Sequence, residues 1–440
     1  MSNKSKTTNT KEEATPALVP KLRFPEFRDA EGWSKEKLGP KSKKVGSGIT
    51  PTGGDKNYKQ SGRPFVRSQN VGWGALLLDD VAFIDEDTHN SFSSTQIEVL
   101  DVLLNITGAS IGRSALADAR IEGGNVNQHV CIIRVKPAEL SPLFLKQYLI
   151  SQDGQKQIDS FQAGGNRQGL NFEQIRSFLI PLPSVFGEQQ KIAECLSSVD
   201  ELIAAQARKL AALKTHKKGL MQQLFPCEGE TQPRLRFPEF QNAWEWDSDS
   251  LGSIFDTSSG GTPDRSKEEY WNGNIPWITT SLVDFNIIME ADEFITDAGL
   301  SNSSAKLFPK MTILVAMYGQ GKTRGQVAML GIKAATNQAC AAILPRKDID
   351  PRFVFLNLGS RYVEMRRLSN SGGQENLSQG LIQGLQFSYP QDVDEQQRIA
   401  DCLTSLDDLI AAQTQKLHAL KTHKNGLMQQ LFPSPEEVEA

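Results

Sequence analysis

The sequence predicts a mixed α/β (α+β) fold in which two globular variable domains are separated by two long, nearly identical helices. These helices are expected to pair as an antiparallel coiled coil, which gives the chain a pseudo-twofold internal repeat. Residues 188–226 recur 207 positions later as residues 395–433, with 30 of 39 aligned positions identical. The motif LRFPEF also occurs twice, at 22–27 and at 235–240. An internal repeat of this kind sets the domain order before any local motif is considered.

The two repeats divide the chain into alternating variable and conserved segments. The offset between the copies falls from 213 at the LRFPEF motif to 207 at the helix, so the variable domains have similar lengths and are expected to share one fold. Short apolar runs between Gly, Pro and Asn turns, with helical segments among them, predict an α/β architecture for each. The expected segments are a disordered tail at 1–18, a variable domain at 19–185, a central helix at 186–226, a linker at 227–233, a second variable domain at 234–392, a C-terminal helix at 393–433 and a tail at 434–440.

Composition indicates an ordinary soluble protein. The chain has 440 residues, of which 38% are hydrophobic and 23% are charged, and its formal net charge is −4. This charge lowers the expectation of nucleic-acid binding, but it does not exclude a basic face opposed by acidic surfaces elsewhere. The five cysteines form no CxxC pair, the first residues do not resemble a signal peptide, and no apolar run approaches the roughly 18 residues that cross a bilayer. We therefore expect a reduced, cytoplasmic protein without membrane association.

Each repeated helix carries apolar residues at the a and d positions of a 3.5-residue repeat, the pattern of a coiled coil. Polar residues interrupt both seams at equivalent positions, Gln206 and Lys217 in the first copy and Gln413 and Lys424 in the second. A parallel, in-register pair would oppose the two lysines, so the pattern favours an antiparallel pair whose register stays open. The residues expected to pair are Leu196, Val199, Ile203, Leu210 and Leu213 in the first helix and Leu403, Leu406, Ile410, Leu417 and Leu420 in the second.

A plain amphipathic helix packed on its own domain would also show an apolar stripe. The identity of the two copies, however, extends to residues of the polar face such as Gln189, Gln190 and His216. Two dissimilar variable domains would not require the same polar residues. The repeat therefore favours equal surfaces that meet equal partners.

Weak similarities link the two variable domains in the same order along the chain. Thr50-Pro51 corresponds to Thr262-Pro263, and Asn127-Gln128 corresponds to Asn337-Gln338. Together with the duplicated LRFPEF motif and the helix starts EQQKIA and EQQRIA, these features make the chain resemble the specificity subunit of type I restriction–modification systems. The resemblance covers residues from about 20 to 433, which is nearly the whole chain.

The resemblance implies a function in DNA recognition. Each variable domain would be a target recognition domain for one half of a bipartite, asymmetric site in double-stranded DNA. The paired helices would act as a spacer and as the docking surface for two methylation subunits, beside restriction subunits. The chain would then be a non-catalytic subunit of a type I restriction endonuclease and adenine-N6 DNA methyltransferase complex. S-adenosylmethionine, ATP and Mg are expected on the partner subunits, and no cofactor is expected on this chain.

Loop residues of both variable domains have the chemistry for DNA contacts. Arg suits guanine, Asn and Gln suit adenine, and Lys, Ser and Thr suit phosphates. Asn127-Gln128 and Asn337-Gln338 are common to domains expected to recognise different bases, so structural or phosphate-binding roles are favoured for them. The simpler alternative for any single candidate is a solvated loop side chain. The candidates are Arg63, Arg67, Gln69, Asn70, Arg113, Asn166 and Arg167 in the first domain and Arg265, Thr279, Ser281, Gln320, Lys322, Arg324, Gln374 and Asn376 in the second.

Two alternatives to DNA recognition stay open. The stretch 316–323, AMYGQGKT, satisfies a relaxed phosphate-loop pattern, which would indicate a nucleotide-binding enzyme. A true phosphate loop needs a helix directly after Lys322-Thr323, and the following residues start a helix poorly. No other catalytic pattern and no cluster of metal ligands occurs, so no catalytic or metal site is predicted. The second alternative is a tandem protein–protein interaction module, and basic loops on one face of both variable domains would argue against it.

Overall fold

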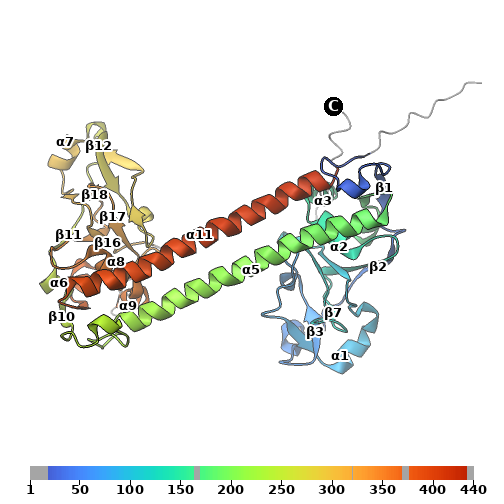
Figure 1. Ribbon diagram of the computed structural model, residues 1–440, viewed down its shortest axis with the longest axis horizontal. Coiled ribbons are helices and arrows are strands. Elements are labelled where there is room, and N and C mark those ends of the chain that lie inside the picture. Colours follow the sequence, from blue (N-terminus) through green and yellow to red (C-terminus); the bar gives the residue numbers. More distant parts are fainter. Residues whose placement is uncertain (1–17, 163–168, 320, 369–375, 434–440) are drawn as a thin grey trace, which may run out of the picture. The chain divides into compact units, whose positions relative to one another are not determined.

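The computed structural model describes residues 18–162, 169–319, 321–368 and 376–433 (Figure 1). The chain separates into two compact units: unit 1 comprises residues 1–207 and 415–440, and unit 2 comprises residues 208–414. The long helices α5 (Phe186–Leu224) and α11 (Val393–Leu431) both cross this boundary, so each unit contains one globular part and a portion of each helix.

The described chain begins at Leu18, the last residue of the expected disordered tail. Leu18 is buried and forms a β-bridge with Trp33, so this residue belongs to the folded part. The rest of that tail and the expected tail at 434–440 lie outside the described residues.

Unit 1 contains two main sheets and one short strand pair. Its strands are β1 (Ser34–Lys37), β2 (Ser42–Ser47), β3 (Arg63–Val66), β4 (Ala82–Ile84), β5 (Val102–Asn105), β6 (Ser114–Leu116), β7 (Asn125–Val126), β8 (Val130–Val135) and β9 (Leu179–Leu182). The antiparallel sheet has the order β2-β8-β5-β6, the second sheet has the order β4-β3-β7, and β1 pairs with β9. Its helices are α1 (Glu86–Ser91), α2 (Pro142–Leu149), α3 (Gln152–Ser160) and α4 (Phe172–Arg176), with short 3-10 turns η1 (Pro25–Phe27), η2 (Gly54–Asn57), η3 (Ser68–Asn70), η4 (Ser93–Thr95) and η5 (Gly108–Ser110).

Unit 2 is built from a corresponding set of elements. Its strands are β10 (Asp247–Ser250), β11 (Thr257–Ser259), β12 (Trp271–Ile278), β13 (Ile287–Ile288), β14 (Glu293–Ile295), β15 (Leu307–Phe308), β16 (Ile313–Ala316), β17 (Val327–Leu330), β18 (Ala334–Thr336), β19 (Cys340–Ile343) and β20 (Gln386–Tyr389). Its helices are α6 (Leu251–Ile254), α7 (Asp297–Ser301), α8 (Pro351–Ser360), α9 (Tyr362–Leu368) and α10 (Gln379–Gln383), with 3-10 turns η6 (Pro238–Phe240), η7 (Glu268–Tyr270) and η8 (Thr280–Leu282).

The globular parts of the two units share one strand order. The run β11-β19-β16-β17 repeats β2-β8-β5-β6, and β14-β12-β18 repeats β4-β3-β7, while β13 and β15 extend the sheets of unit 2 at their edges. The one parallel contact of the smaller sheet also recurs, with Val66 opposite Val126 in unit 1 and Ile278 opposite Thr336 in unit 2. The expectation that the variable domains share a fold is confirmed, although their sequences are hardly alike.

In each unit one apolar core joins the globular part to both long helices. In unit 1, residues of β5, β8 and α2 pack with Ile192 and Leu196 of α5 and with Met428 and Leu431 of α11. In unit 2, residues of β16, β19 and α8 pack with the beginning of α11 and the end of α5. Figure 1 shows α2 beside α5 and α8 beside α11. Each globular part is thus fixed to the start of one helix and the end of the other.

The two long helices contact each other through lysines at the expected polar seam positions. In unit 1, Lys424 Nζ lies 2.6 Å from Asp200 Oδ1. In unit 2, Lys217 Nζ lies 2.5 Å from Asp407 Oδ1. Each lysine therefore meets an aspartate of the other helix. The aspartate partners were not among the predicted pairing residues.

In unit 1 a second lysine joins this ion pair. Lys146 Nζ of α2 lies 3.3 Å from Asp200 Oδ2, and burial lowers the pKa of this lysine. Burial acts to raise the pKa of Asp200, but the ammonium groups of Lys146 and Lys424 outweigh this effect, and the pKa is lowered. The carboxylate of Asp200 is thus the shared counter-charge of two lysines where α2 packs against the long helices.

The apolar seam residues differ in exposure from their neighbours on the same helices. Leu196, Leu210 and Leu403 are buried, and the other seven predicted pairing residues are half-buried. Alanines on the opposite face, such as Ala204 and Ala411, are exposed. None of the helices in the described ranges combines the length and the hydropathy that a bilayer-spanning segment needs.

Candidate nucleic-acid interface

Four loops meet at one end of the two main sheets in unit 1, and we call them the unit 1 loop cluster. They are the Thr-Pro turn at 50–51, the turn at 67–70 after β3, the loop at 106–113 between β5 and β6, and the turn at 127–129 between β7 and β8. Because β3 and β7 are parallel neighbours and β5 and β8 are antiparallel neighbours, the topology brings these four connections together.

Hydrogen bonds tie the loops of this cluster to one another. Asn105 Nδ2 donates to Ser68 O at 2.8 Å, and Thr107 Oγ1 lies 2.6 Å from His129 Nδ1. Their residues line an open hollow of about 370 Å³, formed by Ser68, Thr107, Gly108, Ala109, Ser110, Arg113 and His129. The hollow offers hydroxyls, an imidazole and a guanidinium, which are groups that suit an anionic ligand.

In both units the threonine of the Thr-Pro pair contacts the glutamine of the Asn-Gln pair. The hydroxyl of Thr50 donates to Gln128 Oε1, and that of Thr262 donates to Gln338 Oε1. These residues therefore recur because they join the same two loops in each unit. Of the two roles left open for them, the structure shows a structural one.

A glycine before each Thr-Pro turn permits the close approach of these loops. A Cβ atom added at Gly48 would lie 1.6 Å from Val126 O, and one at Gly260 would lie 2.1 Å from Thr336 O. Any larger residue would have to displace the strand that carries the Asn-Gln turn. The glycines are thus needed to build the loop cluster in both units.

The turn after β3 has a counterpart of different chemistry in unit 2. The backbone N–H of Asn127 donates to Val66 O at 3.0 Å, and that of Asn337 donates to Ile278 O at 3.0 Å, so the frame is the same. On this frame unit 1 carries Arg67 and Gln69 at the positions where unit 2 carries Thr279 and Ser281. Equal backbones with different donors and acceptors are what recognition of two different sequences requires.

Asn70 does not fit its assignment as a DNA contact. Its side chain is completely buried, its Nδ2 donates to Leu77 O at 2.9 Å and to Asp80 Oδ1 at 3.0 Å, and its Oδ1 accepts from the backbone N–H of Arg67 at 3.0 Å. With both ends of the amide engaged inside the protein, Asn70 shapes the turn that carries Arg67 and Gln69.

The candidates Arg63 and Arg265 are held by carboxylates. Arg63 Nε lies 2.7 Å from Glu86 Oε1, and this hydrogen bond lowers the pKa of Glu86. Arg265 Nη1 lies 2.5 Å from Glu293 Oε2, and its Cζ lies 4.0 Å from the centre of the Trp271 ring. Both arginine side chains remain exposed, at 39% and 57%. To contact DNA, either guanidinium would use its remaining N–H groups or exchange its carboxylate for a phosphate or a base.

Two other candidates present cationic groups without such a partner. The Arg113 guanidinium and the Lys322 ammonium form no hydrogen bond or ion pair within the described ranges. Arg113 lines the hollow of unit 1, and Lys322 is exposed in the loop between β16 and β17, the counterpart of the loop at 106–113. Arg324, further along that loop, is half-buried, and Asn376 is exposed.

Asn166, Arg167, Gln320 and Gln374 lie outside the described residues. Close to three of them, the chain is hydrogen-bonded to the residues that follow β5 and β16. The backbone N–H of Leu170 donates to Ile106 O at 2.9 Å, and that of Leu377 donates to Met317 O at 3.0 Å. Leu170 and Leu377, which come shortly after segments 163–168 and 369–375, are therefore anchored at the beginning of the loops that carry Arg113 and Lys322.

The phosphate-loop hypothesis is wrong on structural grounds. After Thr323 the chain forms a turn and continues into β17, so the helix that a phosphate loop requires is absent from this described segment. The hydroxyl of Tyr362 donates to Lys322 O at 2.6 Å, which fixes the turn in place. Within the ranges that the structure covers, no group of three or more His, Cys, Asp and Glu side chains is placed to bind a metal ion.

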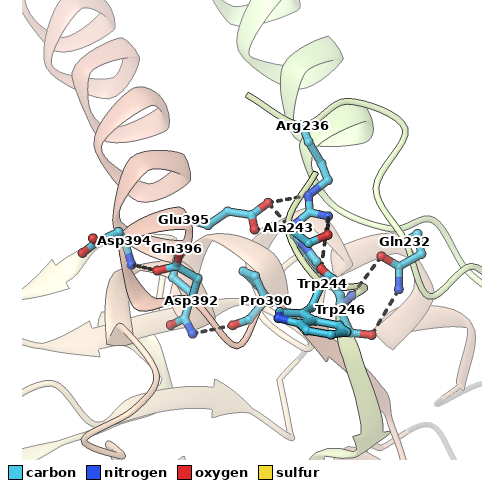
Figure 2. Close-up of polar contacts among 10 residues, drawn as sticks. All are labelled: Gln232, Arg236, Ala243, Trp244, Trp246, Pro390, Asp392, Asp394, Glu395 and Gln396. Carbon is cyan, nitrogen blue, oxygen red and sulfur yellow. Dashed lines mark hydrogen bonds and ion pairs between the residues drawn. The ribbon is translucent and has the colours of Figure 1, made fainter. Parts of the chain in front are cut away.

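Each LRFPEF motif is fastened to the start of a long helix by a buried ion pair, as Figure 2 shows for unit 2. Arg236 Nε lies 2.8 Å from Glu395 Oε1, and the indole N–H of Trp246 donates to the same oxygen at 3.2 Å. In unit 1, Arg23 Nε lies 2.8 Å from Glu188 Oε1. The sequence contained a signal for these pairs, because both partners belong to repeated blocks, but the pairing itself was not predicted.

The repeated glutamines at the helix starts also have structural roles. Gln189 Oε1 accepts from the backbone N–H of Ser141 at 3.0 Å, and Gln396 Oε1 accepts from that of Asp350 at 2.7 Å. Both glutamines are buried. The inference that these residues recur because of an external partner is therefore wrong for Gln189, since the two globular parts offer the same backbone site.

Further along the helices, the repeated surface is exposed. Leu202 and Leu409 occupy equivalent positions and are 57% and 39% exposed. Lys214, Thr215 and His216 are exposed as well. The two copies thus present the same apolar group at equivalent exposed positions.

The family model and the related proteins that match this sequence all belong to one family. The sequence matches the family described as Type I restriction modification DNA specificity domain over residues 45–215 and 244–422. The specificity subunit of an Escherichia coli type I restriction enzyme is 27% identical over 273 residues, which cover 59% of this chain and 64% of that protein. A Methanocaldococcus jannaschii protein, provisionally named a type I restriction enzyme specificity subunit, is 21% identical over 91% of this chain and 93% of its own length.

Solved structures share the fold. The S subunit of a type I restriction-modification system from M. genitalium matches 95% of this chain and 100% of its own length, with a TM-score of 0.58 and 17% identity. A chain from a structural study of complex assembly in a type I R-M system matches 92% of this chain and 98% of its own length, with a TM-score of 0.56 and 16% identity.

Proposed function

Because the chain belongs to the type I restriction modification DNA specificity family, we propose that each unit recognises one half of a bipartite, asymmetric site in double-stranded DNA. In this proposal residues 19–185 and 234–392 are the two target recognition domains. The observation that carries it is the repeated loop frame with different side chains, Arg67 and Gln69 in unit 1 against Thr279 and Ser281 in unit 2.

The proposal divides the candidate residues by chemistry. Arg67, Gln69, Thr279 and Ser281 stand on the two equivalent turns and are proposed to contact base edges. Arg113 and Lys322, which lie on equivalent loops, are proposed to contact phosphates, because a cation without a protein partner is available to the DNA backbone. The remaining proposed contacts are Arg63, Asn166, Arg167, Arg265, Gln320, Arg324, Gln374 and Asn376.

The phosphate role of Arg113 and Lys322 predicts a specific change in salt dependence. Replacing either residue by alanine should weaken binding of specific and non-specific DNA alike and should reduce the slope of log K against log salt by about 1. The measurement is DNA binding by the assembled complex over a series of salt concentrations. Arg113→Lys, which keeps the charge, should retain the slope. Loss of discrimination at one base pair with an unchanged slope would contradict this assignment.

The exposed faces of α5 and α11 are proposed to dock the methylation subunits. Leu202 and Leu409 support this placement, since they present the same apolar group at equivalent positions of the two copies. Equal surfaces fit two copies of one partner, and restriction subunits would join the same complex. In this proposal S-adenosylmethionine, ATP and Mg act on the partner subunits, which methylate adenine at N6, while this chain supplies sequence recognition.

The helices are also proposed to set the distance between the two half-sites. Inserting four residues near Ala211 adds one helical turn of about 6 Å, and B-DNA rises about 3.4 Å per base pair. The variant should therefore recognise the same half-sites separated by one or two additional base pairs, as determined by sequencing methylated adenines. An insertion of two residues is the matched control, because it rotates the apolar stripe away from its partner and should prevent assembly. An active four-residue variant with the parental spacing would refute the spacer role.

The proposed function as a whole is tested by sequencing methylated adenines in cells that carry this chain with its methylation partners. A bipartite motif with an unspecified spacer should be found, and it should disappear when this chain is deleted. Methylation without a motif, or with a motif unaffected by the deletion, would favour the protein-interaction alternative.

A further inference from the structure

Three side chains of the turn after β3 converge on one carboxylate in unit 1. Arg67 Nη2 donates to the backbone oxygen of Asp80 at 2.6 Å and lies 3.6 Å from its Oδ2. The amide of Gln69 donates to Asp80 Oδ2, and Asn70 Nδ2 donates to Asp80 Oδ1 at 3.0 Å. Both oxygens of the Asp80 side chain are therefore directed at the turn that carries the proposed base contacts.

The backbone reinforces this arrangement. The N–H of Leu77 donates to Asn70 O at 2.8 Å, and Asn70 Nδ2 donates to Leu77 O at 2.9 Å. Residues 67–70 and 77–80 thus form two sides of a closed loop. The guanidinium of Arg67 also lies over the ring of Tyr58, with Cζ 5.3 Å from the ring centre. Arg67 is limited in its rotamers from two directions before any ligand binds.

We propose that Asp80 is a specificity-determining positioning residue of unit 1, one that orients Arg67 and Gln69 for base recognition without touching DNA itself. The proposal rests on the proposed function of the loop cluster. Gln69 illustrates the effect: this side chain is exposed, and its amide nitrogen donates to Asp80, which leaves the amide oxygen as the acceptor for a ligand. A group whose donor and acceptor ends are fixed beforehand discriminates between base edges better than one that can rotate.

The negative charge of Asp80 by itself does not discriminate between sequences. Asp80 is 61% exposed, so it repels the phosphates of any DNA that approaches the turn, whatever its sequence. This repulsion weakens specific and non-specific binding alike. An effect of Asp80 on specificity must therefore come from the orientation of Arg67 and Gln69.

Unit 2 has a different arrangement at the equivalent turn. Thr279 Oγ1 lies 2.5 Å from Ser281 Oγ, so these two hydroxyls bond to each other. No carboxylate contacts either hydroxyl within the described ranges. The effect of Asp80 should therefore be confined to the half-site that unit 1 recognises.

Asp79 provides a matched control. It is exposed, carries the same charge, and its side chain forms no hydrogen bond or ion pair with the rest of the described chain. Asp80→Asn and Asp79→Asn thus change the net charge equally, but only the first alters the positioning contacts. The two variants separate the orientation of Arg67 and Gln69 from a simple effect of charge.

The experiment compares the assembled complexes of wild type, Asp80→Asn and Asp79→Asn by binding to specific and non-specific DNA and by methylated-adenine sequencing. Asp80→Asn should lower the ratio of specific to non-specific affinity about tenfold, the discrimination of one good side chain–base contact. Methylated sites should become degenerate in the half recognised by unit 1 only. Asp79→Asn should shift both affinities by the same factor and leave the motif unchanged.

Retention of the other half-site in the same methylation data shows that the Asp80→Asn complex is folded. Equal behaviour of the two variants, or equal degeneracy in both half-sites, would overturn the role of Asp80. Failure of the proposed function would differ from both outcomes, because the wild-type complex would then show no bipartite motif.

Discussion

Exchange of the globular part of unit 2 for that of a relative is expected to replace one half of the recognised DNA sequence and to leave the other half unchanged. The reason is that the loops proposed to contact DNA in each unit are built on that unit's own two sheets. The structure indicates suitable boundaries: β10 begins at Asp247 and pairs with β20, which ends at Tyr389. Exchanging 247–389 moves this strand pair as a whole and keeps Arg236, Trp246 and Glu395 in place.

The same exchange in unit 1 is the matched control. There β1 begins at Ser34 and β9 ends at Leu182, so replacing 34–182 leaves the Arg23–Glu188 pair intact. Methylated-adenine sequencing should show that this variant changes the opposite half of the motif. A single exchange that altered both halves, or an assembled and active hybrid with the parental motif, would contradict independent recognition by the two units.

Loss of the buried ion pair at a helix start should lower the stability of unit 2 substantially. Glu395 and Glu188 are each 1% exposed, and their arginine partners are 14% and 7% exposed. Glu395→Gln keeps the shape of the side chain but leaves Arg236 buried without a counter-charge. Removing one partner of a buried pair costs about 3 kcal/mol or more. The free energy of unfolding of unit 2, followed by urea denaturation, should fall by about this amount.

An exposed ion pair at the same junction supplies the control. Glu239 of the LRFPEF repeat and Arg398 of α11 are 47% and 51% exposed. Glu239→Gln should lower the free energy of unfolding by less than about 1 kcal/mol, because water screens an exposed pair. Equal losses for Glu395→Gln and Glu239→Gln would show that burial of the Arg236–Glu395 pair does not stabilise the junction.

Features encoded by repetition and periodicity were predictable from the sequence. The duplicated blocks predicted helical segments at 186–226 and 393–433, and the structure has α5 at Phe186–Leu224 and α11 at Val393–Leu431. The 3.5-residue pattern identified seam residues that are buried or half-buried. The similar offsets indicated one fold for both variable domains. Such features repeat along the chain or depend on neighbouring residues, so a single sequence contains them.

What only the tertiary structure decided was the partner of each polar side chain. Asn70 and Gln69 look alike as candidate base contacts in the sequence, yet one is completely buried and the other is exposed. Nothing in the sequence singled out Asp80, and only the fold places it against Arg67. Gln189 looked like a surface residue and instead caps a backbone group 48 positions away. Whether a polar group is buried, paired or available to a ligand depends on contacts between segments far apart in the chain, and neither composition nor periodicity encodes those contacts.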